Sequence, residues 1–219
     1  MSFRQLLSLS GAKNVLTSNI RYSTSCWSCG KTSQLRENLF CSNCNVLQKP
    51  SEKNYFKIIG INETFDLDEE NLAKRYKQLQ RYLHPDKYAN KDEKEHAISE
   101  EYSSLVNEAY KTLLEPLSRG IYMLRLKGED ISENTEVDNS FLMTIMEKNE
   151  EVENAETKEE IMALNKEIKE QIKVLQKEVS GKFFEGDLKG VIRLLSVMKY
   201  YTSIDNQIQA AIREKGIIQ

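Results

Sequence analysis

Glycine and proline are scarce in this chain of 219 residues, which holds nine glycines and three prolines. A fold of many short strands needs many tight turns, and turns most often require these two residues. The scarcity therefore favours long helices over a many-turned β fold. No apolar run approaches the roughly 18 residues that a membrane-spanning helix needs, so we expect a soluble protein without a membrane partner.

Several functional classes also lack their usual residues. The net charge of −3 gives no basic footprint for nucleic acid. The chain has only two histidines, His84 and His96, and no serine or cysteine with a plausible triad partner. It has no glycine-rich loop that could cradle phosphates. We therefore expect neither an enzyme, nor a nucleotide-binding chain, nor a nucleic-acid-binding protein.

Acidic residues are missing from the N-terminal segment, since the first in the chain is Glu37. Residues 1–22 instead hold Arg4, Lys13 and Arg21 among serines, a threonine and leucines. This is the composition of a mitochondrial transit peptide, whereas a secretory signal would need an unbroken apolar core. A disordered basic tail is the alternative. We predict a transit peptide over 1–22, cleavage near Arg21 and a location in the mitochondrial matrix.

All four cysteines follow in two pairs, Cys26–Cys29 and Cys41–Cys44, with eleven residues between the pairs. Two such knuckles supply four thiolates to one tetrahedral ion, although the intervening loop is slightly shorter than usual. Disulfides and a redox motif are the alternatives, but cysteines two residues apart seldom pair structurally, and no βαβ pattern accompanies them. We predict one structural zinc ion, in preference to iron, in a module over 23–49.

Trp27 and Phe40 are expected to form a small core over this metal. A connector from Asn45 to Lys53 then follows, with a turn at Pro50.

The tripeptide His84-Pro85-Asp86 lies between two amphipathic stretches. Leu72, Tyr76, Leu79 and Leu83 share one helical face before it, and Ile98, Tyr102, Leu105, Ala109 and Leu113 share another after it. Pro85 disfavours helical dihedrals at His84 and ends the first helix. Two such helices pack antiparallel, so the tripeptide is expected at the exposed tip of a hairpin. Alone, it would indicate only a turn.

Three neighbouring motifs change that interpretation: Asn54–Gly60, Phe65 with Leu67, and Asn107–Leu113. Together with His84-Pro85-Asp86 they resemble a J domain, the module by which J-protein co-chaperones stimulate ATP hydrolysis on DnaK-type heat-shock chaperones. The predicted J domain covers residues 54–128, where Gly128 suits the end of a further helix that starts near Pro116.

This resemblance implies that the basic helix docks on the chaperone's ATPase domain and that the loop reaches its interdomain linker. The expected chaperone-binding residues are His84, Pro85, Asp86, Lys74, Arg75, Lys77, Arg81 and Lys87. The cations would supply attraction that raises the association rate and weakens with salt. Asp86 would accept charge-assisted hydrogen bonds from a partner arginine. Without the adjacent tripeptide, the basic face would indicate only a solvated surface.

Residues 138–216 are predicted to form an antiparallel three-helix bundle, which makes the whole fold mainly α. The first helix carries Phe141, Leu142, Ile145 and Met146 and then becomes acidic. The second has an apolar stripe from Ile161 to Val179, and the third begins after a bend marked by Ser180-Gly181 and Gly186. Asp187 is a candidate cap for the third helix.

The order of cysteine knuckles, J domain and acidic bundle resembles the HscB family of J-proteins, in its form with an N-terminal tetracysteine module. Members deliver an IscU-type iron–sulfur scaffold protein to a DnaK-type chaperone and promote cluster transfer. By position, the implied scaffold-binding residues are Leu142, Met143, Met146, Glu147, Glu150 and Tyr200. Two departures from the family pattern weaken this transfer: Met146 stands where leucine is common, and Asn149 and Asn154 replace charges found in bacterial members.

Helical geometry alone does not decide whether these apolar residues face solvent or the bundle core, because Phe141 and Ile145 share one stripe of the helix and Leu142 and Met146 share the adjacent one. Phe141 and Ile145 are the better core candidates, which leaves Leu142, Met143 and Met146 facing outward. Two other functions stay open: a J-protein with a folding or import client, and a metal or redox protein that uses its J domain as a recruiter. A homodimer is also possible.

Overall fold

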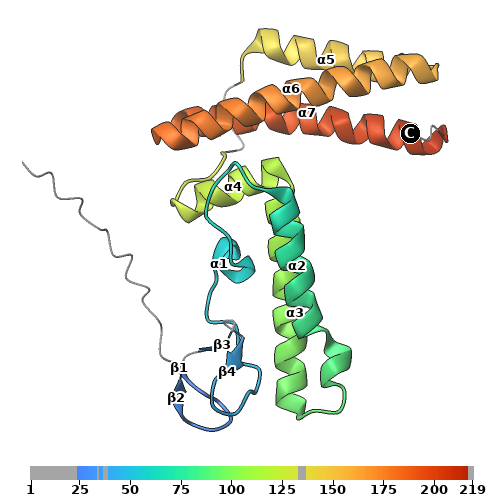
Figure 1. The fold of residues 1–219 in the computed structure, drawn as a ribbon. Helices are drawn as coiled ribbons and strands as arrows, with labels where there is room; N and C mark the ends of the chain where they lie inside the picture. The colour runs from blue at the N-terminus through green and yellow to red at the C-terminus, as the bar shows by residue number, and fades with distance from the viewer. Residues whose placement is uncertain (1–23, 34, 37–38, 133–136, 217–219) are drawn as a thin grey trace, which may run out of the picture. The chain divides into compact units, whose positions relative to one another are not determined.

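The computed structural model describes residues 24–33, 35–36, 39–132 and 137–216. The chain divides into two compact units, Met1–Gln48 and Lys49–Gln219. Every secondary-structure element in the described part of the second unit is a helix, which confirms the predicted mainly α fold (Figure 1). Among the described residues, no helix is both long enough and apolar enough to cross a bilayer. The predicted transit peptide lies outside the described residues.

Two small hairpins build the described part of the first unit. Strand β1 (Thr24–Ser25) pairs antiparallel with β2 (Thr32–Ser33), and β3 (Leu35–Arg36) pairs antiparallel with β4 (Phe40–Cys41). Phe40 also bridges to Leu47, and both Leu47 and Gln48 are buried. The expected connector therefore begins after Gln48, later than Asn45, because this segment folds back onto the module.

A helical hairpin dominates the first half of the second unit. Helix α2 (Glu69–Leu83) and helix α3 (Glu93–Leu114) are joined by a 3₁₀ turn, η1 (Pro85–Tyr88). Asp68 and Asp92 cap the two helices, because their side-chain carboxylates accept hydrogen bonds from backbone N–H groups of the first turn. The apolar stripes face inward as the sequence predicts, since the following residues are buried: Leu72, Leu79, Leu83, Ile98, Tyr102, Val106, Ala109 and Leu113.

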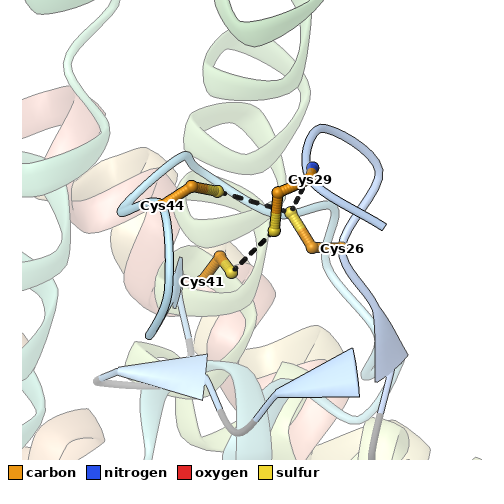
Figure 2. Close-up of side chains that lie close together, drawn as sticks. All are labelled: Cys26, Cys29, Cys41 and Cys44. Atoms are coloured by element: carbon orange, nitrogen blue, oxygen red, sulfur yellow. Dashed lines mark hydrogen bonds between the residues drawn. The ribbon is translucent and has the colours of Figure 1, made fainter. Parts of the chain in front are cut away.

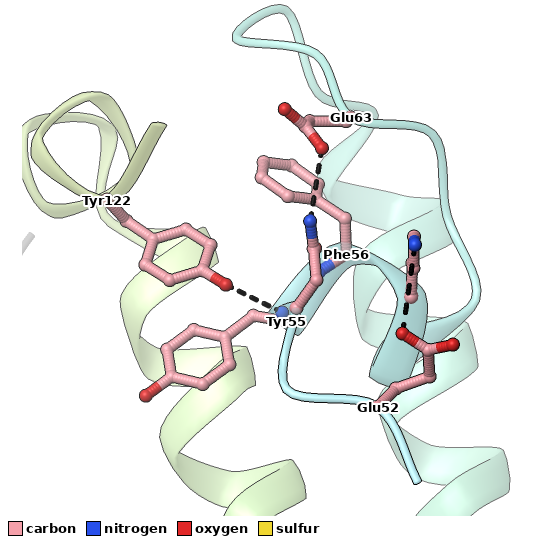
Figure 3. Close-up of polar contacts among 7 residues, drawn as sticks. Glu52, Tyr55, Phe56, Glu63 and Tyr122 are labelled. Carbon is pink, nitrogen blue, oxygen red and sulfur yellow. Dashed lines mark hydrogen bonds and ion pairs between the residues drawn. The ribbon is translucent and has the colours of Figure 1, made fainter. Parts of the chain in front are cut away.

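Helices α1 (Tyr55–Ile59) and α4 (Pro116–Leu126) pack against this hairpin. The start of α1 is held by Tyr122 of α4, whose hydroxyl accepts a hydrogen bond of 2.9 Å from the Tyr55 N–H (Figure 3). The rings of Tyr55 and Tyr122 also stack, with centroids 4.4 Å apart. Asn54 caps α1 and donates to Glu63, while Glu52 pairs with Lys57. These contacts fix the entry into the hairpin.

Helices α5 (Asn139–Asn154), α6 (Lys158–Glu185) and α7 (Leu188–Glu214) form the predicted three-helix bundle. Its core contains Ile145, Ile161, Ile168, Ile204 and Ile208, with Phe141 packed against it. The bend between α6 and α7 is at Gly186, whose φ of 75° is left-handed, and Asp187 caps α7. Ser180 and Gly181 do not break the helix as predicted, because Val179 and the residues before it bury α6 against α7.

The hairpin and the bundle meet where α4 crosses α7. Gly120 of α4 is buried, and a Cβ atom there would lie 2.6 Å from a methyl carbon of Leu195. Phe65 adds a ring contact to Phe183 of α6, with centroids 5.7 Å apart. Arg119 lies over the Phe65 ring and donates a 2.7 Å hydrogen bond to the Leu113 carbonyl.

Candidate metal centre and partner-binding surfaces

The two cysteine knuckles have the same backbone geometry. In the first, the Cys26 carbonyl accepts from the Gly30 N–H at 2.9 Å and the Cys26 N–H donates to Lys31 at 3.0 Å. In the second, Cys41 makes the equivalent bonds with Asn45 and Val46, also at 2.9 and 3.0 Å. The residue after each second cysteine has positive φ, 68° for Gly30 and 58° for Asn45. Glycine and asparagine are the residues that tolerate this conformation best.

This repeated geometry aims four sulfurs at one point (Figure 2). The Sγ atoms of Cys26 and Cys44 are 3.6 Å apart, and those of Cys29 and Cys41 are 3.9 Å apart. All four lie within 4.8 Å of one another. No disulfide joins them, and these separations are far longer than an S–S bond of about 2.05 Å. The four cysteines are therefore positioned to bind a metal ion.

Hydrogen-bond donors surround the Cys26 sulfur. The backbone N–H groups of Ser28 and Cys29 lie 3.4 and 3.5 Å from it, and the Gln48 side-chain nitrogen lies at 3.4 Å. Burial raises the pKa of the Cys26 thiol, but the backbone N–H groups of Cys29 and Ser28, together with the thiols of Cys44 and Cys29, outweigh it and hold the pKa below its ordinary value. The donors thus favour the thiolate, which is the form that binds metal.

Trp27 and Phe40, which the sequence places in a small core over the metal, are both half-buried. The indole N–H of Trp27 donates a 2.7 Å hydrogen bond to the Leu47 carbonyl, and the buried apolar residues are Leu39 and Leu47. Gln48 was missed by the sequence interpretation. The sequence could not predict its contact with Cys26, because Gln48 lies in the expected connector and belongs to no motif whose spacing would place it near a cysteine.

His84 and Asp86 lie in the turn between α2 and α3, as expected for a hairpin tip. The side chain of His84 is 58% exposed and that of Asp86 is 89% exposed. The backbone N–H of Asp86 donates to Nδ1 of His84 at 3.3 Å, which makes the imidazole a local cap for η1. Behind them, the buried Tyr88 donates a 2.9 Å hydrogen bond to the Tyr82 carbonyl and ties η1 to the end of α2.

Four of the five predicted basic residues are exposed: Lys74, Lys77, Arg81 and Lys87. Arg75 differs, because it is half-buried against the end of α1. Its Nε donates to the Ile59 carbonyl at 3.3 Å and its Nη1 donates to Gln78 at 2.9 Å. Arg75 therefore has a structural role between α1 and α2.

The apolar patch predicted on α5 lies mainly at the surface. Met143 and Met146 are 65% and 63% exposed, and Tyr200 of α7 is 36% exposed. Leu142 is half-buried, and Ile145 is buried in the bundle. Phe141 joins the two helices, since its ring meets Tyr200 edge-on with centroids 5.8 Å apart.

Glu147 and Glu150 are exposed and acidic on the same helix as this patch. The neighbouring Lys148 is held inward, with Nζ 2.8 Å from Glu151 and 2.9 Å from Glu167 of α6. This pairing leaves the α5 surface apolar and negative.

The loop and the patch belong to opposite ends of the second unit. Helix α2 starts near the bundle, where Asp66 accepts a hydrogen bond from Ser180 of α6. Its 15 residues then run for roughly 22 Å to the loop at its other end. The loop and the patch are therefore separate surfaces.

Comparison with known proteins agrees with this division. Residues 54–122 match the DnaJ domain and residues 137–209 match the HSCB C-terminal oligomerisation domain. The iron-sulfur cluster co-chaperone protein HscB of Homo sapiens is 40% identical over 189 residues, which are 84% of this chain and 80% of the human protein. The Mus musculus protein of the same name is 36% identical over 189 residues, which are 84% of this chain and 81% of the mouse protein.

The fold has the same relatives. The crystal structure of human co-chaperone protein HscB matches with a TM-score of 0.78 and 37% identity, covering 86% of this chain and 98% of that chain. Co-chaperones are a non-enzymatic class. With its J domain, its C-terminal domain and these relatives, the chain belongs to the HscB family of iron–sulfur cluster co-chaperones.

Proposed function

We propose that this protein binds the iron–sulfur cluster scaffold protein, delivers it to a DnaK-type mitochondrial heat-shock chaperone and stimulates the chaperone's ATPase. The observation that carries this proposal is the presence of two separate exposed surfaces in one unit. One is the His84–Asp86 loop with its basic helix, and the other is the apolar and acidic patch on α5 and α7. A protein that joins a client to a chaperone needs both.

The chaperone-binding surface is suited to a negatively charged partner. Lys74, Lys77, Arg81 and Lys87 are solvated cations, which steer association rather than fix a tight contact. Asp86 carries an exposed carboxylate for a partner arginine, and Pro85 restricts the loop around it. Arg75 is expected to contribute less, because its guanidinium already bonds to Ile59 and Gln78.

The scaffold-binding surface combines flexible apolar side chains with negative charge. Exposed methionines adapt to an irregular partner surface, and Met143 and Met146 are among the most exposed large apolar residues of the described chain. Glu147 and Glu150 would select a partner with basic residues around its apolar contact. Tyr200 extends the patch onto α7 as a rigid aromatic anchor.

The cysteine module is proposed to hold one structural zinc ion through Cys26, Cys29, Cys41 and Cys44. Four thiolates around a tetrahedral ion at a Zn–S distance of about 2.3 Å lie about 3.8 Å apart. The Sγ separations of 3.6 and 3.9 Å fit this value. A bound ion of this kind stabilises a module that is too small to fold on its apolar core alone.

We further propose the mitochondrial matrix as the location, on the basis of the acid-free, arginine- and serine-containing segment 1–22. A reducing matrix also suits a thiolate metal site. Cluster transfer to recipient proteins would follow the chaperone cycle, and this chain itself would perform no catalysis.

Single-turnover ATP hydrolysis by a mitochondrial DnaK-type chaperone tests the proposal. The protein alone should stimulate hydrolysis, and scaffold protein added with it should stimulate further. Substituting Leu142, Met143 and Met146 together by alanine should remove only the second effect. A wild-type protein that stimulates hydrolysis but gives no further effect with scaffold would favour a J-protein with a folding or import client.

A further inference from the structure

The Gln48 side chain connects the two knuckles of the metal module. Its Nε2 atom lies 3.4 Å from the Cys26 sulfur and 2.9 Å from the Val46 carbonyl oxygen. An amide NH₂ has two hydrogens, so one group can donate to both acceptors. The residue is only 6% exposed. The amide is therefore held in place between the first knuckle and the segment that leaves the second.

Gln48 is fixed in this position by its own backbone. Its N–H donates to the Leu39 carbonyl at 2.8 Å. The Val46 carbonyl that receives the side-chain amide also accepts the Cys41 N–H at 3.0 Å. Movement of Gln48 would thus disturb both Cys26 and the start of the second knuckle.

A second amide makes a similar contact from the opposite side. Nδ2 of Asn43, within the second knuckle, lies 3.6 Å from the Cys29 sulfur. Its oxygen accepts from Lys31 Nζ at 3.2 Å, and this bond orients the amide nitrogen toward the sulfur. Asn43 and Lys31 are exposed, so water competes for these bonds. The Asn43 contact is therefore weaker than the buried Gln48 contact.

We propose that Gln48 is a positioning residue of the metal centre, with Asn43 in a lesser version of the same role. This inference rests on the proposal that the four cysteines bind zinc. Four thiolates around a divalent ion leave two net negative charges in a half-buried site. N–H donors stabilise that charge and orient the ligands, and loss of such outer groups typically lowers metal affinity about 10- to 100-fold. Gln48 thereby slows metal loss and holds the two knuckles together.

Three substitutions separate this role from simple packing. Gln48→Met keeps the length of the side chain but removes both donors. Gln48→Glu replaces the amide nitrogen by a carboxylate oxygen, which repels the Cys26 thiolate. Asn43→Ala removes the exposed donor. Lys49→Met is the matched control, because Lys49 is the exposed neighbour of Gln48 in the chain.

Zinc transfer from the full chain to a chromogenic chelator measures the effect. Gln48→Met should lower zinc affinity about 10- to 100-fold and speed release, and Gln48→Glu should lower it further. Asn43→Ala should have an effect below that of Gln48→Met, and Lys49→Met should behave as wild type. Equal zinc affinity and release for wild type and Gln48→Met would overturn the proposal.

A direct measurement on the wild type does not depend on any variant folding. In a full chain labelled with ¹⁵N and loaded with ¹¹³Cd, a hydrogen bond to a metal-bound sulfur transmits scalar coupling from cadmium to the donor proton. We expect this coupling at a Gln48 side-chain amide proton. Bound cadmium without that coupling would overturn the role of Gln48 alone, whereas failure to bind cadmium would overturn it together with the metal site.

Discussion

Replacing Gly120 by alanine places a methyl group where α4 lies against α7. The new carbon would be 2.6 and 2.9 Å from the two Leu195 methyl carbons and 3.2 Å from a ring carbon of Phe65. Carbon atoms rest at about 3.5–4.0 Å, so the methyl group is about 1 Å too close. Leu195 and Phe65 are buried, at 0% and 3% exposure, and cannot turn outward to make room.

The expected loss of stability follows from two opposing contributions. Forced overpacking of a core costs about 1–3 kcal/mol, while alanine in place of glycine inside a helix returns about 0.5–1 kcal/mol. Gly120→Ala should therefore lower the free energy of unfolding by about 1 kcal/mol, within the range of about 0–2.5 kcal/mol that the two contributions leave. Gly181 is the matched control, because it lies within α6 and a Cβ there meets no atom within 4 Å. Gly181→Ala should raise stability by about 0.5–1 kcal/mol.

Urea unfolding followed by circular dichroism compares the two variants through their midpoints. With a slope of about 2 kcal/mol/M, Gly120→Ala should lower the midpoint by about 0.5 M, and Gly181→Ala should raise it. The decisive result is that the two midpoints shift in opposite directions, because both variants make the same glycine-to-alanine change within a helix. If Gly120→Ala were as stable as Gly181→Ala, the tight contact of α4 with α7 would not exist as described.

Three further outcomes are expected. His84→Gln should keep scaffold affinity but abolish stimulation of the chaperone ATPase, since the loop is far from α5; full stimulation in a steady-state ATPase assay would disprove the assigned mechanism. Serine at all four cysteines should abolish zinc binding in elemental analysis and lower the melting temperature but spare ATPase stimulation; lost stimulation in a folded variant would favour a direct role for the module. Burial and the nearby Glu52 charge raise the pKa of Tyr102 to about 12, so the folded state keeps this proton at a pH where the unfolded chain, with a pKa of about 10, loses it. The contribution of Tyr102 to stability should be unaffected below pH of about 10 and should fall by up to about 1.4 kcal/mol per pH unit between pH of about 10 and about 12. Tyr102→Phe should remove that share of the alkaline loss in urea titrations, and an unchanged loss would contradict the assignment.

Much of the second unit was predictable from residue patterns. Pro85 fixes where α2 must end, so the hairpin and its exposed tip follow from the chain alone. The outward direction of Met143 and Met146 followed from placing Ile145 in the core, and the structure buries Ile145 and exposes both methionines. In both regions the spacing of apolar residues along the helix was enough to predict which side chains are buried.

Other features depend on contacts between distant residues. Gly181 looked like a helix break, but burial of α6 against α7 exceeds the small cost of one internal glycine. Arg75 belonged by sequence to a solvated basic face, yet its guanidinium meets the Ile59 carbonyl at the end of α1. Gln48 reaches Cys26 only because the chain after the second knuckle folds back onto the module. The helical spacing of apolar residues and the spacing of motifs do not predict contacts between residues that are distant in the sequence.

The patch on α5 and α7 is proposed to bind the iron–sulfur scaffold protein, and the whole function depends on this contact. Calorimetric titration of the full chain with a mitochondrial scaffold protein tests it most directly. The test variant is Leu142→Ala/Met143→Ala/Met146→Ala. The control is Phe184→Ala, which removes an apolar side chain on α6 that is 95% exposed. We predict micromolar binding that the triple variant loses and Phe184→Ala keeps. No binding by the folded wild-type protein, or equal binding by the triple variant, would contradict the claim.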